Sequence, residues 1–582
     1  MRRYWWQTIL LSICLFVVVF ANLQLPNRMA SIVNEGIVGA DQYIIWQQGA
    51  YMIGITIIGG LALVAAGFLA SRIGTGFARD VRSDIFRQVM SYSIADIENF
   101  STSSLITRTT NDVTQVQAAL IIVLRLSLQA PIMGAGAIIM ALQTAPNMTW
   151  IIATAVVILV AIVAIITPIV MPKFKLRQEM TDDLNRVTRE NLTGLRVVRA
   201  FNNEEHAERK FHDINKPLTI LHRDIDRILI ITMPIVTLVV NLALLGVVWF
   251  GAHYIYDGVT QVGDVMAFMQ YALQVMQAFM FLVMAFIIVP RALVSWKRVV
   301  EVLNTHTSIQ SPKQPKEPAA GKHANIEFRD VTFSYLDAEE PVLRNISFTA
   351  KSGQTTAFIG STGSGKSTLI NLIPRFYDVT SGSVLVNGLD VREYDEADLR
   401  RRIGIVPQKS TLFTGTVAEN IALGLQDTSD MKCIRRAARI AQAEDFVQKL
   451  DGKYDYEIAQ GGNNVSGGQK QRLSIARAVA RDPEIYIFDD SFSALDFKTD
   501  ARLRSELTPV VKDACVLIVA QRVGTIKNAD QIIVLDKGRI VGHGTHYQLL
   551  QSCKIYREIT ESQFSESEFK AELRKSKQKA GK

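Results

Sequence analysis

Six stretches in the first three hundred residues contain no Asp, Glu, Lys or Arg, and they constrain the fold more than any other feature. Each is about 20 residues or longer, which as a helix spans roughly 30 Å of hydrocarbon. We therefore expect six transmembrane helices. They are expected over residues 5–25, 43–71, 126–145, 150–172, 228–256 and 265–290.

The first stretch follows Arg2 and Arg3, which is also how a secretory signal peptide begins. No clear small-residue cleavage site follows it, and five more apolar stretches come after it. We therefore favour a membrane helix over a cleaved leader for residues 5–25.

Basic residues are distributed unequally between the loops. The two long loops, residues 72–125 and 173–227, are rich in Lys and Arg, whereas Arg28 is the one basic residue of the three short loops. The short loops are residues 26–42, 146–149 and 257–264. Because basic loops stay in the cytoplasm, we expect the long loops and both termini on that side. The net charge of +8 largely reflects this asymmetry, so nucleic acid is not an expected partner.

The two long loops keep a helical period, for example over residues 77–90 and 177–201. A 20-residue helical extension reaches about 30 Å beyond the bilayer. We interpret these loops as levers, and we expect another part of the protein to push on their tips.

One face of the sixth stretch is polar. Gln270, Gln274 and Gln277 follow at i, i+4 and i+7, and Met280 is one of several methionines around them. Polar side chains at membrane depth tend to face a cavity, and methionines suit a promiscuous binding surface. These four residues are therefore candidates for a substrate cavity. Hydrogen bonding between packed helices is an equally good interpretation.

The chain changes in composition after the sixth stretch. We expect a membrane domain over residues 1–304, a linker over 305–322 and a soluble α/β domain over 323–560. The charged tail, residues 561–582, shows no apolar period and is expected to be helical or disordered. The four cysteines are scattered, so neither a zinc site nor a disulfide framework is indicated.

The soluble half contains a glycine-rich loop between an apolar run, residues 355–359, and a helical run, residues 369–375. The loop consists of Gly360, Ser361, Thr362, Gly363, Ser364, Gly365, Lys366, Ser367 and Thr368. This pattern in a strand–loop–helix setting is typical of a phosphate-binding P-loop. Lys366 is expected to reach the β- and γ-phosphates, and Ser367 to bind Mg²⁺.

Two further elements point to nucleotide chemistry. The apolar run 485–488 ends in Asp489 and Asp490, an arrangement in which Asp489 would hold Mg²⁺. A Ser-Gly-Gly-Gln turn precedes the helical run 470–481 and predicts a second anion site at a helix start. Its residues are Ser466, Gly467, Gly468 and Gln469. If the two sites grip different nucleotides, two such domains must face each other head to tail.

The ordered set of these motifs resembles the nucleotide-binding domain of ABC transporters over residues 323–560. The set comprises Tyr335, residues 360–368, Gln408, residues 466–469, Asp489 and residues 493–496. The membrane half is similar to an ABC exporter half-transporter, with residues 99–112 and 190–201 in the place of its two intracellular loops. The fold class implied is a multidomain membrane protein, with an all-α six-helix domain and a P-loop α/β domain.

The resemblance implies ATP and Mg²⁺ as cofactors and assigns a role to each motif residue. Tyr335 would stack on adenine, and Gln408 would join Ser367 and Asp489 around Mg²⁺. Ser466 to Gln469 would contact ATP held by a partner chain, and Asp496 would belong to the D-loop. The intracellular loops would seat on nucleotide-binding domains.

Two positions depart from the family's pattern within one nucleotide site. Asp490 stands where a Glu normally polarises the attacking water, and Gln521 stands where a switch His normally contacts the γ-phosphate. Asp is one methylene shorter than Glu, and a misplacement of about 1 Å can cost on the order of 100-fold in rate. Tolerated variation is the alternative for either change alone. The Ser466–Gln469 turn is intact, apart from Val465 where Leu is usual.

This pattern is similar to heterodimeric bacterial exporters, in which one ATP site is degenerate. We expect a different half-transporter as partner, with Glu and His at these two positions, in a bacterial cytoplasmic membrane. A homodimer with two slow sites is the alternative. The expected activity is ATP-driven efflux of amphipathic small molecules by alternating access. A peptide or lipid exporter, or an ATP-gated channel, is the alternative, whereas six membrane stretches exclude a soluble ABC factor.

Overall fold

The structure, a computed structural model, describes residues 2–318, 324–336, 338–425 and 427–580. These residues form two compact units. The first contains the chain up to Gln88 together with Ser103–Thr305, and the second contains Val89–Thr102 together with the chain from His306 onward. The expected linker, residues 305–322, is described as far as residue 318, and residues 319–322 lie outside the described residues.

Long helices make up the first unit. They are α1 (Trp5–Ser31), α2 (Gln42–Met90), α5 (Val113–Thr144), α6 (Thr149–Thr193), α8 (Glu204–Tyr256) and α9 (Val262–Asn304). The short helices α4 (Thr102–Thr107) and α7 (Leu195–Ala200) and the π-helical turns η2 (Ile32–Val38) and η3 (Arg108–Asp112) join them. The prediction of six membrane helices is confirmed, because the described residues contain six helices long and apolar enough to cross a membrane.

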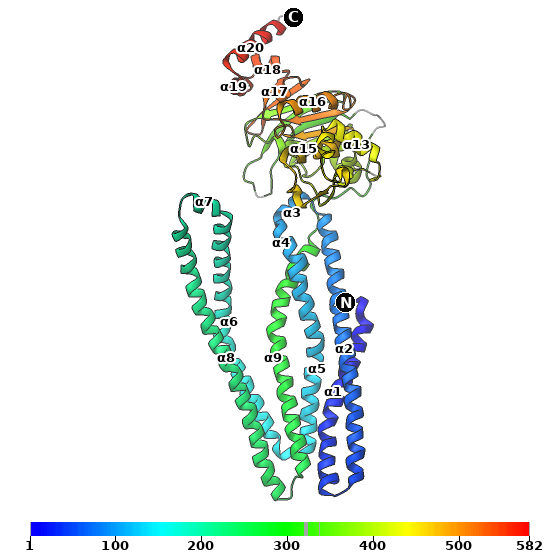
Figure 1. The fold of residues 1–582 in the computed structure, drawn as a ribbon, viewed down its shortest axis with the longest axis vertical. Helices are drawn as coiled ribbons and strands as arrows, with labels where there is room; N and C mark the ends of the chain where they lie inside the picture. The colour runs from blue at the N-terminus through cyan, green and yellow to red at the C-terminus, as the bar shows by residue number, and fades with distance from the viewer. Residues whose placement is uncertain (1, 319–323, 337, 426, 581–582) are drawn as a thin grey trace. The chain divides into compact units, whose positions relative to one another are not determined.

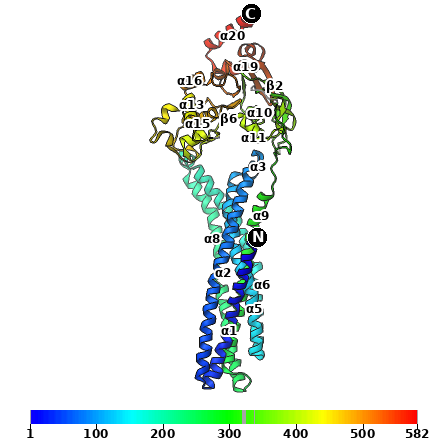
Figure 2. The same cartoon turned by 90° about the vertical axis from the view of Figure 1, so that its right-hand side faces the viewer.

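The helices extend well beyond the charge-free stretches. At 1.5 Å per residue, the 53 residues of α8 measure roughly 80 Å, far more than the bilayer needs. Figures 1 and 2 show the long helices running alongside one another, while the α6–α8 pair diverges from α5 and α9 towards α7. The lever-like extensions inferred from the sequence are therefore continuous with the membrane helices.

Small residues allow close packing in the first unit. Leu11 and Leu15 of α1 pack against Ala66 and Ala70 of α2. A larger cluster joins α5 to α9 through Ala137, Ala141, Ala267, Phe268 and Ala272. Many large apolar side chains are nevertheless exposed, including Ile53, Leu61 and Val64 on α2. Such an apolar exterior is what a helix bundle presents to lipid.

Two principal sheets form the framework of the second unit. A six-stranded sheet has the order β12-β11-β3-β10-β9-β6, and a four-stranded antiparallel sheet has the order β2-β1-β4-β5. The first contains β3 (Thr355–Gly360), β6 (Ile403–Val406), β9 (Ile485–Asp489), β10 (Cys515–Val519), β11 (Gln531–Asp536) and β12 (Arg539–Gly544). The second contains β1 (Ile326–Phe333), β2 (Leu343–Ala350), β4 (Ser381–Val386) and β5 (Leu389–Asp390), and β7 (Gly415–Thr416) pairs with β8 (Glu457–Ile458).

The register of the six-stranded sheet brings the predicted motifs together. The strands β3, β6, β9, β10 and β11 are parallel, and only β12 is antiparallel. Val519 of β10 lies opposite Asp489 of β9 and opposite Phe358 of β3. The segments that follow these three strands therefore leave from one edge of the sheet. Ligands of open α/β sheets bind at this carboxyl edge.

The second unit also contains shorter helices. They are α3 (Ile94–Phe100), α10 (Lys366–Asn371), α11 (Glu396–Arg401), α12 (Val417–Ala422), α13 (Met431–Ile440), α14 (Glu444–Val447), α15 (Gly467–Ala480), α16 (Phe497–Leu507), α17 (Val523–Ile526), α18 (His546–Ser552), α19 (Lys554–Gln563) and α20 (Glu566–Ala580). The 3₁₀ turns described in this unit are η5 (Val391–Glu393), η6 (Lys453–Asp455) and η7 (Gln460–Gly462). Those described in the first unit are η1 (Arg2–Tyr4) and η4 (Pro146–Met148). Together with the confirmed membrane helices, these elements give the expected fold class.

Two apolar residues of the C-terminal tail are buried or partly buried, although its sequence shows no apolar period. Phe569 and Leu573, four residues apart on α20, pack into a hydrophobic cluster with Leu549 and Tyr556 of α18 and α19. Because most other residues of α20 are charged or polar, two apolar residues are too few to give a visible period. Residues 566–580 are helical, which is one of the two states expected for the tail. Residues 581–582 lie outside the described residues.

Candidate functional site

The glycine-rich loop turns from β3 into α10 with its backbone in conformations that favour glycine. Gly363 and Gly365 have φ angles of 81° and 95°. A Cβ added at Gly365 would lie 2.7 Å from Leu343 Cδ2, so a larger residue would meet both backbone strain and a close contact. These two glycines therefore allow the tight turn that leads into α10, and a helix start favours an anion.

A pocket of about 310 Å³ joins this loop to the carboxyl edge of the sheet. Its lining residues are Val342, Thr362, Gly363, Gly365, Lys366, Ser367, Thr368, Gln408, Asp489, Asp490, Val519 and Gln521. The structure thus brings together the predicted Lys366, Ser367, Gln408, Asp489, Asp490 and Gln521. Among the described residues, Tyr335, Ser466–Gln469 and Asp496 do not line it.

Lys366 is held by the loop that it follows. Its ammonium group donates hydrogen bonds to the carbonyl oxygens of Gly360 and Ser361, at 3.0 and 2.7 Å. Burial lowers the pKa of Lys366, and the carboxylates of Asp489 and Asp490 act in the opposite direction. The ammonium group is therefore poised over the loop where a polyphosphate chain would lie.

Ser367 and Asp489 fit a Mg²⁺ ion. The Ser367 hydroxyl donates a hydrogen bond to Asp489 Oδ1 at 3.1 Å, and Asp489 is only 8% exposed. Burial raises the pKa of Asp489. A hydroxyl and a carboxylate are the hard oxygen ligands that Mg²⁺ prefers, and bound phosphates and waters usually supply the rest of its octahedron. These two residues could therefore hold Mg²⁺ beside a bound nucleotide.

Asp490 and Gln521 contact each other in the same pocket. The side-chain amide of Gln521 donates a hydrogen bond to Asp490 Oδ2 at 3.0 Å. The backbone N–H of Asp490 donates a hydrogen bond to the carbonyl oxygen of Val519 at 3.0 Å. Asp490 has a left-handed φ of 46° directly after β9. Burial raises the pKa of the Asp490 carboxyl, although the groups around it favour its ionised form. One carboxylate oxygen of Asp490 thus accepts a hydrogen bond from Gln521, and the catalytic and switch positions expected for these two residues stay predictions.

Tyr335 lies beside the glycine-rich loop without lining the pocket. Its hydroxyl shares a hydrogen bond with Thr368 Oγ1 at 3.0 Å. Its ring packs edge-on against Phe333 and Tyr377, with centroids 5.0 and 5.3 Å apart. The adenine-stacking role assigned to Tyr335 stays a prediction.

The Ser466–Gln469 turn forms the start of α15. Ser466 caps this helix, because its hydroxyl accepts from Gln469 N while Gln469 Oε1 accepts from Ser466 N at 2.8 Å. Ser466 and Gly467 are exposed, and a Cβ added at Gly467 would meet no heavy atom of the described residues within 4 Å. Val465 is buried in the adjoining core, so the smaller side chain packs well there. The helix start is therefore open to a ligand from outside this chain.

Asp496 has a local structural role. It caps α16, and its carboxylate accepts hydrogen bonds from Thr499 N and Thr499 Oγ1 at 2.9 and 2.7 Å. These bonds lower the pKa of Asp496. Its assignment to a D-loop stays a prediction.

The four candidates for a substrate cavity have different environments on α9. Gln274 donates a hydrogen bond to the carbonyl of Asn22 at 3.0 Å, so it joins α9 to α1. Gln270 and Gln277 are exposed, and Met280 is partly buried. This contact of Gln274 agrees with the second interpretation, in which the glutamine forms a hydrogen bond between packed helices. The cavity role of the other three stays a prediction.

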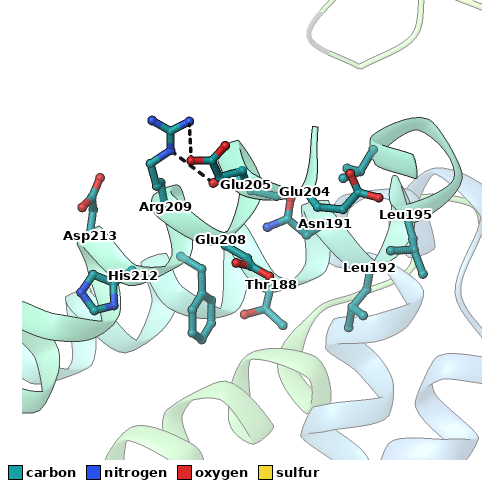
Figure 3. Close-up of a pocket in the computed structure, with 13 residues that line it drawn as sticks. Thr188, Asn191, Leu192, Leu195, Glu204, Glu205, Glu208, Arg209, His212 and Asp213 are labelled. Carbon is teal, nitrogen blue, oxygen red and sulfur yellow. Dashed lines mark hydrogen bonds and ion pairs between the residues drawn. The ribbon is translucent and has the colours of Figure 1, made fainter. Parts of the chain in front are cut away.

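The tip formed by α6, α7 and α8 presents apolar side chains to solvent. Leu192, Val197 and Phe201 are 68%, 60% and 78% exposed. A pocket of about 610 Å³ opens beside them, and Figure 3 shows Glu204, Glu205 and Glu208 along its α8 side. A hydrophobic tip on a long lever is suited to docking on another protein surface.

Sequence reasoning missed Asp96, which joins α3 to the linker within the second unit. Its Oδ2 accepts hydrogen bonds from Ser93 N, Ser93 Oγ, Thr307 Oγ1 and Ser308 N, at 2.7 to 3.2 Å. Asp96 is 7% exposed. The capping box formed by Ser93 and Asp96 was a signal in the sequence, but the contacts with Thr307 and Ser308 required the fold.

Comparison with known proteins agrees with these observations. Residues 8–279 match the model of the ABC transporter transmembrane region, and residues 343–493 match that of the ABC transporter. An uncharacterized ABC transporter ATP-binding protein of Mycobacterium tuberculosis is 42% identical over 550 residues, which cover 94% of each chain.

Two further relatives have more specific names. An ATP-dependent lipid A-core flippase of Syntrophus aciditrophicus is 31% identical over 87% of this chain and 83% of its own. The solved structure of a bacterial Atm1-family ABC exporter with ATP bound superimposes with a TM-score of 0.78 at 25% identity. That comparison covers 97% of this chain and 99% of the exporter.

Proposed function

The chain belongs to the ABC transporter family, as an exporter half-transporter in which a membrane domain is fused to one ATP-binding domain, and from this premise we propose that it functions in a heterodimer. Its own ATP site is then degenerate. Its Ser466–Gln469 turn completes the partner's site, where hydrolysis mainly takes place. The heterodimer exports amphipathic small molecules.

The contact between Gln521 and Asp490 carries this proposal. Both departures from the family's pattern lie in one pocket, and the two side chains bond each other at 3.0 Å. A water molecule would have to compete with the Gln521 amide for one oxygen of Asp490. The neutral amide also cannot supply the charge that a protonated histidine would bring to a γ-phosphate. Slow hydrolysis at this site follows from both effects.

The intact helix start of α15 supports the second half of the proposal. Ser466 and Gly467 are exposed and do not line this chain's own pocket. Exposed N–H groups at a helix start favour an anion, which fits a nucleotide held by the opposite chain. By the resemblance to ABC half-transporters, such a turn would form one half of a nucleotide site shared between two chains.

The second lever tip supports docking on the partner. Phe201, Val197 and Leu192 expose apolar surface on residues that the resemblance assigns to the second intracellular loop. We place this tip on the partner's ATP-binding domain. Closure of the two domains around ATP would then move α6 and α8, and the transport pathway would open outward. This is alternating access driven by a ligand-dependent shift in population.

The membrane helices support an amphipathic substrate. Their six apolar stretches carry no Asp, Glu, Lys or Arg, so no fixed countercharge selects a strongly anionic solute. Gln270, Gln277 and Met280 would offer weak polar and adaptable apolar contacts. A lipid is the second candidate substrate, because a relative that is 31% identical is a lipid A-core flippase.

The ATPase of the purified chain tests the heterodimer. We expect slow hydrolysis by the chain alone, in lipid nanodiscs, and a large increase when the cognate half-transporter is added. The Asp490→Asn variant should leave the rate of the assembled pair nearly unchanged. Brisk hydrolysis by the chain alone that Asp490→Asn abolishes would contradict the proposal.

Transport by reconstituted vesicles tests the substrate. Uphill, ATP-dependent movement of a cationic amphipathic dye would support small-molecule export. Movement of a fluorescent phospholipid between leaflets without dye transport would favour the lipid candidate. Single-channel currents on ATP addition would instead indicate a gated channel.

A further inference from the structure

The last residue of α19 contacts the segment that carries Gln521. The side chain of Gln563 accepts a hydrogen bond from Val523 N at 2.7 Å through Oε1. Its Nε2 donates to the carbonyl oxygen of Gln521, also at 2.7 Å. A single amide therefore ties two backbone groups on either side of Arg522, and it does so from outside the nucleotide pocket.

A shared hydrophobic core supports this contact. The residues of the switch segment, Ala520–Ile526, contribute Ala520, Val523 and Ile526 to one buried cluster. The C-terminal helices contribute Leu549, Leu550, Cys553, Tyr556 and Phe569 to the same cluster. The switch segment thus shares one hydrophobic core with α18, α19, α20 and the sheet, so its position depends on these helices.

The helices on both sides of Gln563 are themselves fixed. In α18, Gln551 donates a hydrogen bond to the carbonyl of Ser576 on α20 at 2.7 Å. Buried His546 shares a hydrogen bond with Tyr556 of α19 at 2.7 Å, and its Nε2 lies 3.7 Å from Glu572 of α20. Because α18 holds both α19 and α20, Gln563 between them has little freedom to leave the switch segment.

The two ends of Gln521 are therefore held by different partners. Its backbone carbonyl accepts from Gln563, while its side chain donates to Asp490 in the pocket. We propose that Gln563 is a positioning residue for this chain's own nucleotide site. Through the backbone, it sets where the Gln521 amide stands and thereby how well the site distinguishes ATP from ADP. This inference rests on the proposed assignment of Gln521 to the γ-phosphate position.

Two substitutions separate the two hydrogen bonds. Gln563→Leu removes both, whereas Gln563→Glu keeps the acceptor for Val523 N and loses the donor to Gln521. Gln448→Leu is the matched control, because it makes the same chemical change in the same unit but breaks only an exposed hydrogen bond to Glu444 at 3.1 Å, away from the switch segment. All variants are made in the full chain, purified alone, so that each molecule presents one nucleotide-binding loop.

The first measurement is hydrogen–deuterium exchange of peptides that cover residues 520–527. In Gln563→Leu we expect faster exchange of the Val523 amide, because its acceptor is gone, and in Gln563→Glu we expect protection to be retained. Gln448→Leu should resemble the unchanged chain. Equal exchange in all four proteins would overturn the inference.

The second measurement is displacement of a fluorescent ATP analogue by ATP and by ADP. We expect Gln563→Leu to weaken ATP binding about 5-fold, the size expected for one or two lost net hydrogen bonds, and to leave ADP binding unchanged. Equal weakening of ATP and ADP would overturn the positioning role and indicate a structural one. Failure of the unchanged chain to bind the analogue would instead contradict the nucleotide site itself.

Discussion

Gln521 donates a hydrogen bond to Asp490, and by the family resemblance these are the positions at which a switch His and a catalytic Glu would be expected. Their contact is formed across two neighbouring strands, since Asp490 follows β9 and Gln521 comes two residues after β10. Asp490 and Gln521 are therefore neighbours in space. The effect of a mutation at one of them on ATPase activity should depend on which residue stands at the other.

If the proposed assignment of this site holds, introducing Glu at position 490 and His at position 521 should make it hydrolyse ATP faster. We expect the double variant Asp490→Glu, Gln521→His to raise the ATPase of the purified chain about 10- to 100-fold, because the longer carboxylate reaches the attacking water and the amide no longer occupies it. Phosphate release in lipid nanodiscs measures this rate.

Each single variant should gain far less than the pair. Asp490→Glu leaves the Gln521 amide as a competitor, and Gln521→His leaves the carboxylate one methylene short. An increase in the double variant no larger than the product of the two single increases would contradict coupling between these residues.

The exposed start of α15 should matter at the partner's site and not at this chain's own. We expect Ser466→Arg to reduce the ATPase of the assembled pair by at least about 100-fold, because a bulky cation fills the helix start that a nucleotide must approach. Binding of a fluorescent ATP analogue to the chain alone should stay unchanged.

Ser429→Arg is the matched control for that variant, because Ser429 is an exposed residue of the same unit and lies outside the pocket lining. It should leave both measurements unaffected. Full ATPase activity in the Ser466→Arg pair would show that this turn does not complete the working site.

The apolar tip should be needed for communication with the partner and not for folding. Phe201 is 78% exposed, so Phe201→Asp removes no core contact and should leave the melting temperature of the chain within about 1 °C. On a docked tip, however, the new carboxylate would be buried without a partner. We expect substrate-stimulated ATPase of the pair to fall several-fold while basal ATPase persists.

Stability should depend on pH through Asp96. Burial would raise the pKa of this carboxyl, but hydrogen bonds from Ser93 and Ser308 outweigh it and hold the pKa below its usual value. A depressed folded-state pKa stabilises the protein above the unfolded pKa of about 4, and the effect is lost as pH falls through the folded value. We expect Asp96→Asn to cost about 2 kcal/mol at pH 7.

Thermal unfolding between pH 7 and pH 3.5 measures this effect. The difference between the unchanged chain and Asp96→Asn should shrink below about pH 4, where the Asp96 carboxylate of the unfolded chain becomes protonated while that of the folded chain is still ionised. Asp84→Asn, on an exposed surface of α2, should show no such difference. A gap between the curves that is constant with pH would contradict the role given to the Asp96 charge.

The local motifs could be predicted because each depends on a short run of residues. Glycines at 363 and 365 are required by the backbone of one loop, and the apolar run before Asp489 is one strand. Six charge-free stretches predict six helices for the same reason, since a bilayer imposes length and polarity on each helix separately. These features determined the membrane domain, the P-loop and the family resemblance.

Contacts between distant segments could not be predicted from the sequence alone. Nothing local to α20 indicates that Phe569 packs with the switch segment, because its apolar residues are too few to form a visible pattern. Asp96 and Ser308 are likewise joined only by the fold. A hydrogen bond of this kind forms only when two segments that are far apart in the sequence come close in space. Their positions depend on the packing of the whole unit, which no short run of residues reveals.

The sequence by itself therefore determined which groups the chain carries, namely six apolar stretches, one glycine-rich loop and the side chains of Asp490 and Gln521. Only the tertiary structure decided that these two residues bond each other and that Gln563 holds the switch segment from the opposite side. The physical reason is that residue types fix what a side chain can donate or accept, whereas the packing of strands and helices fixes which groups come within reach.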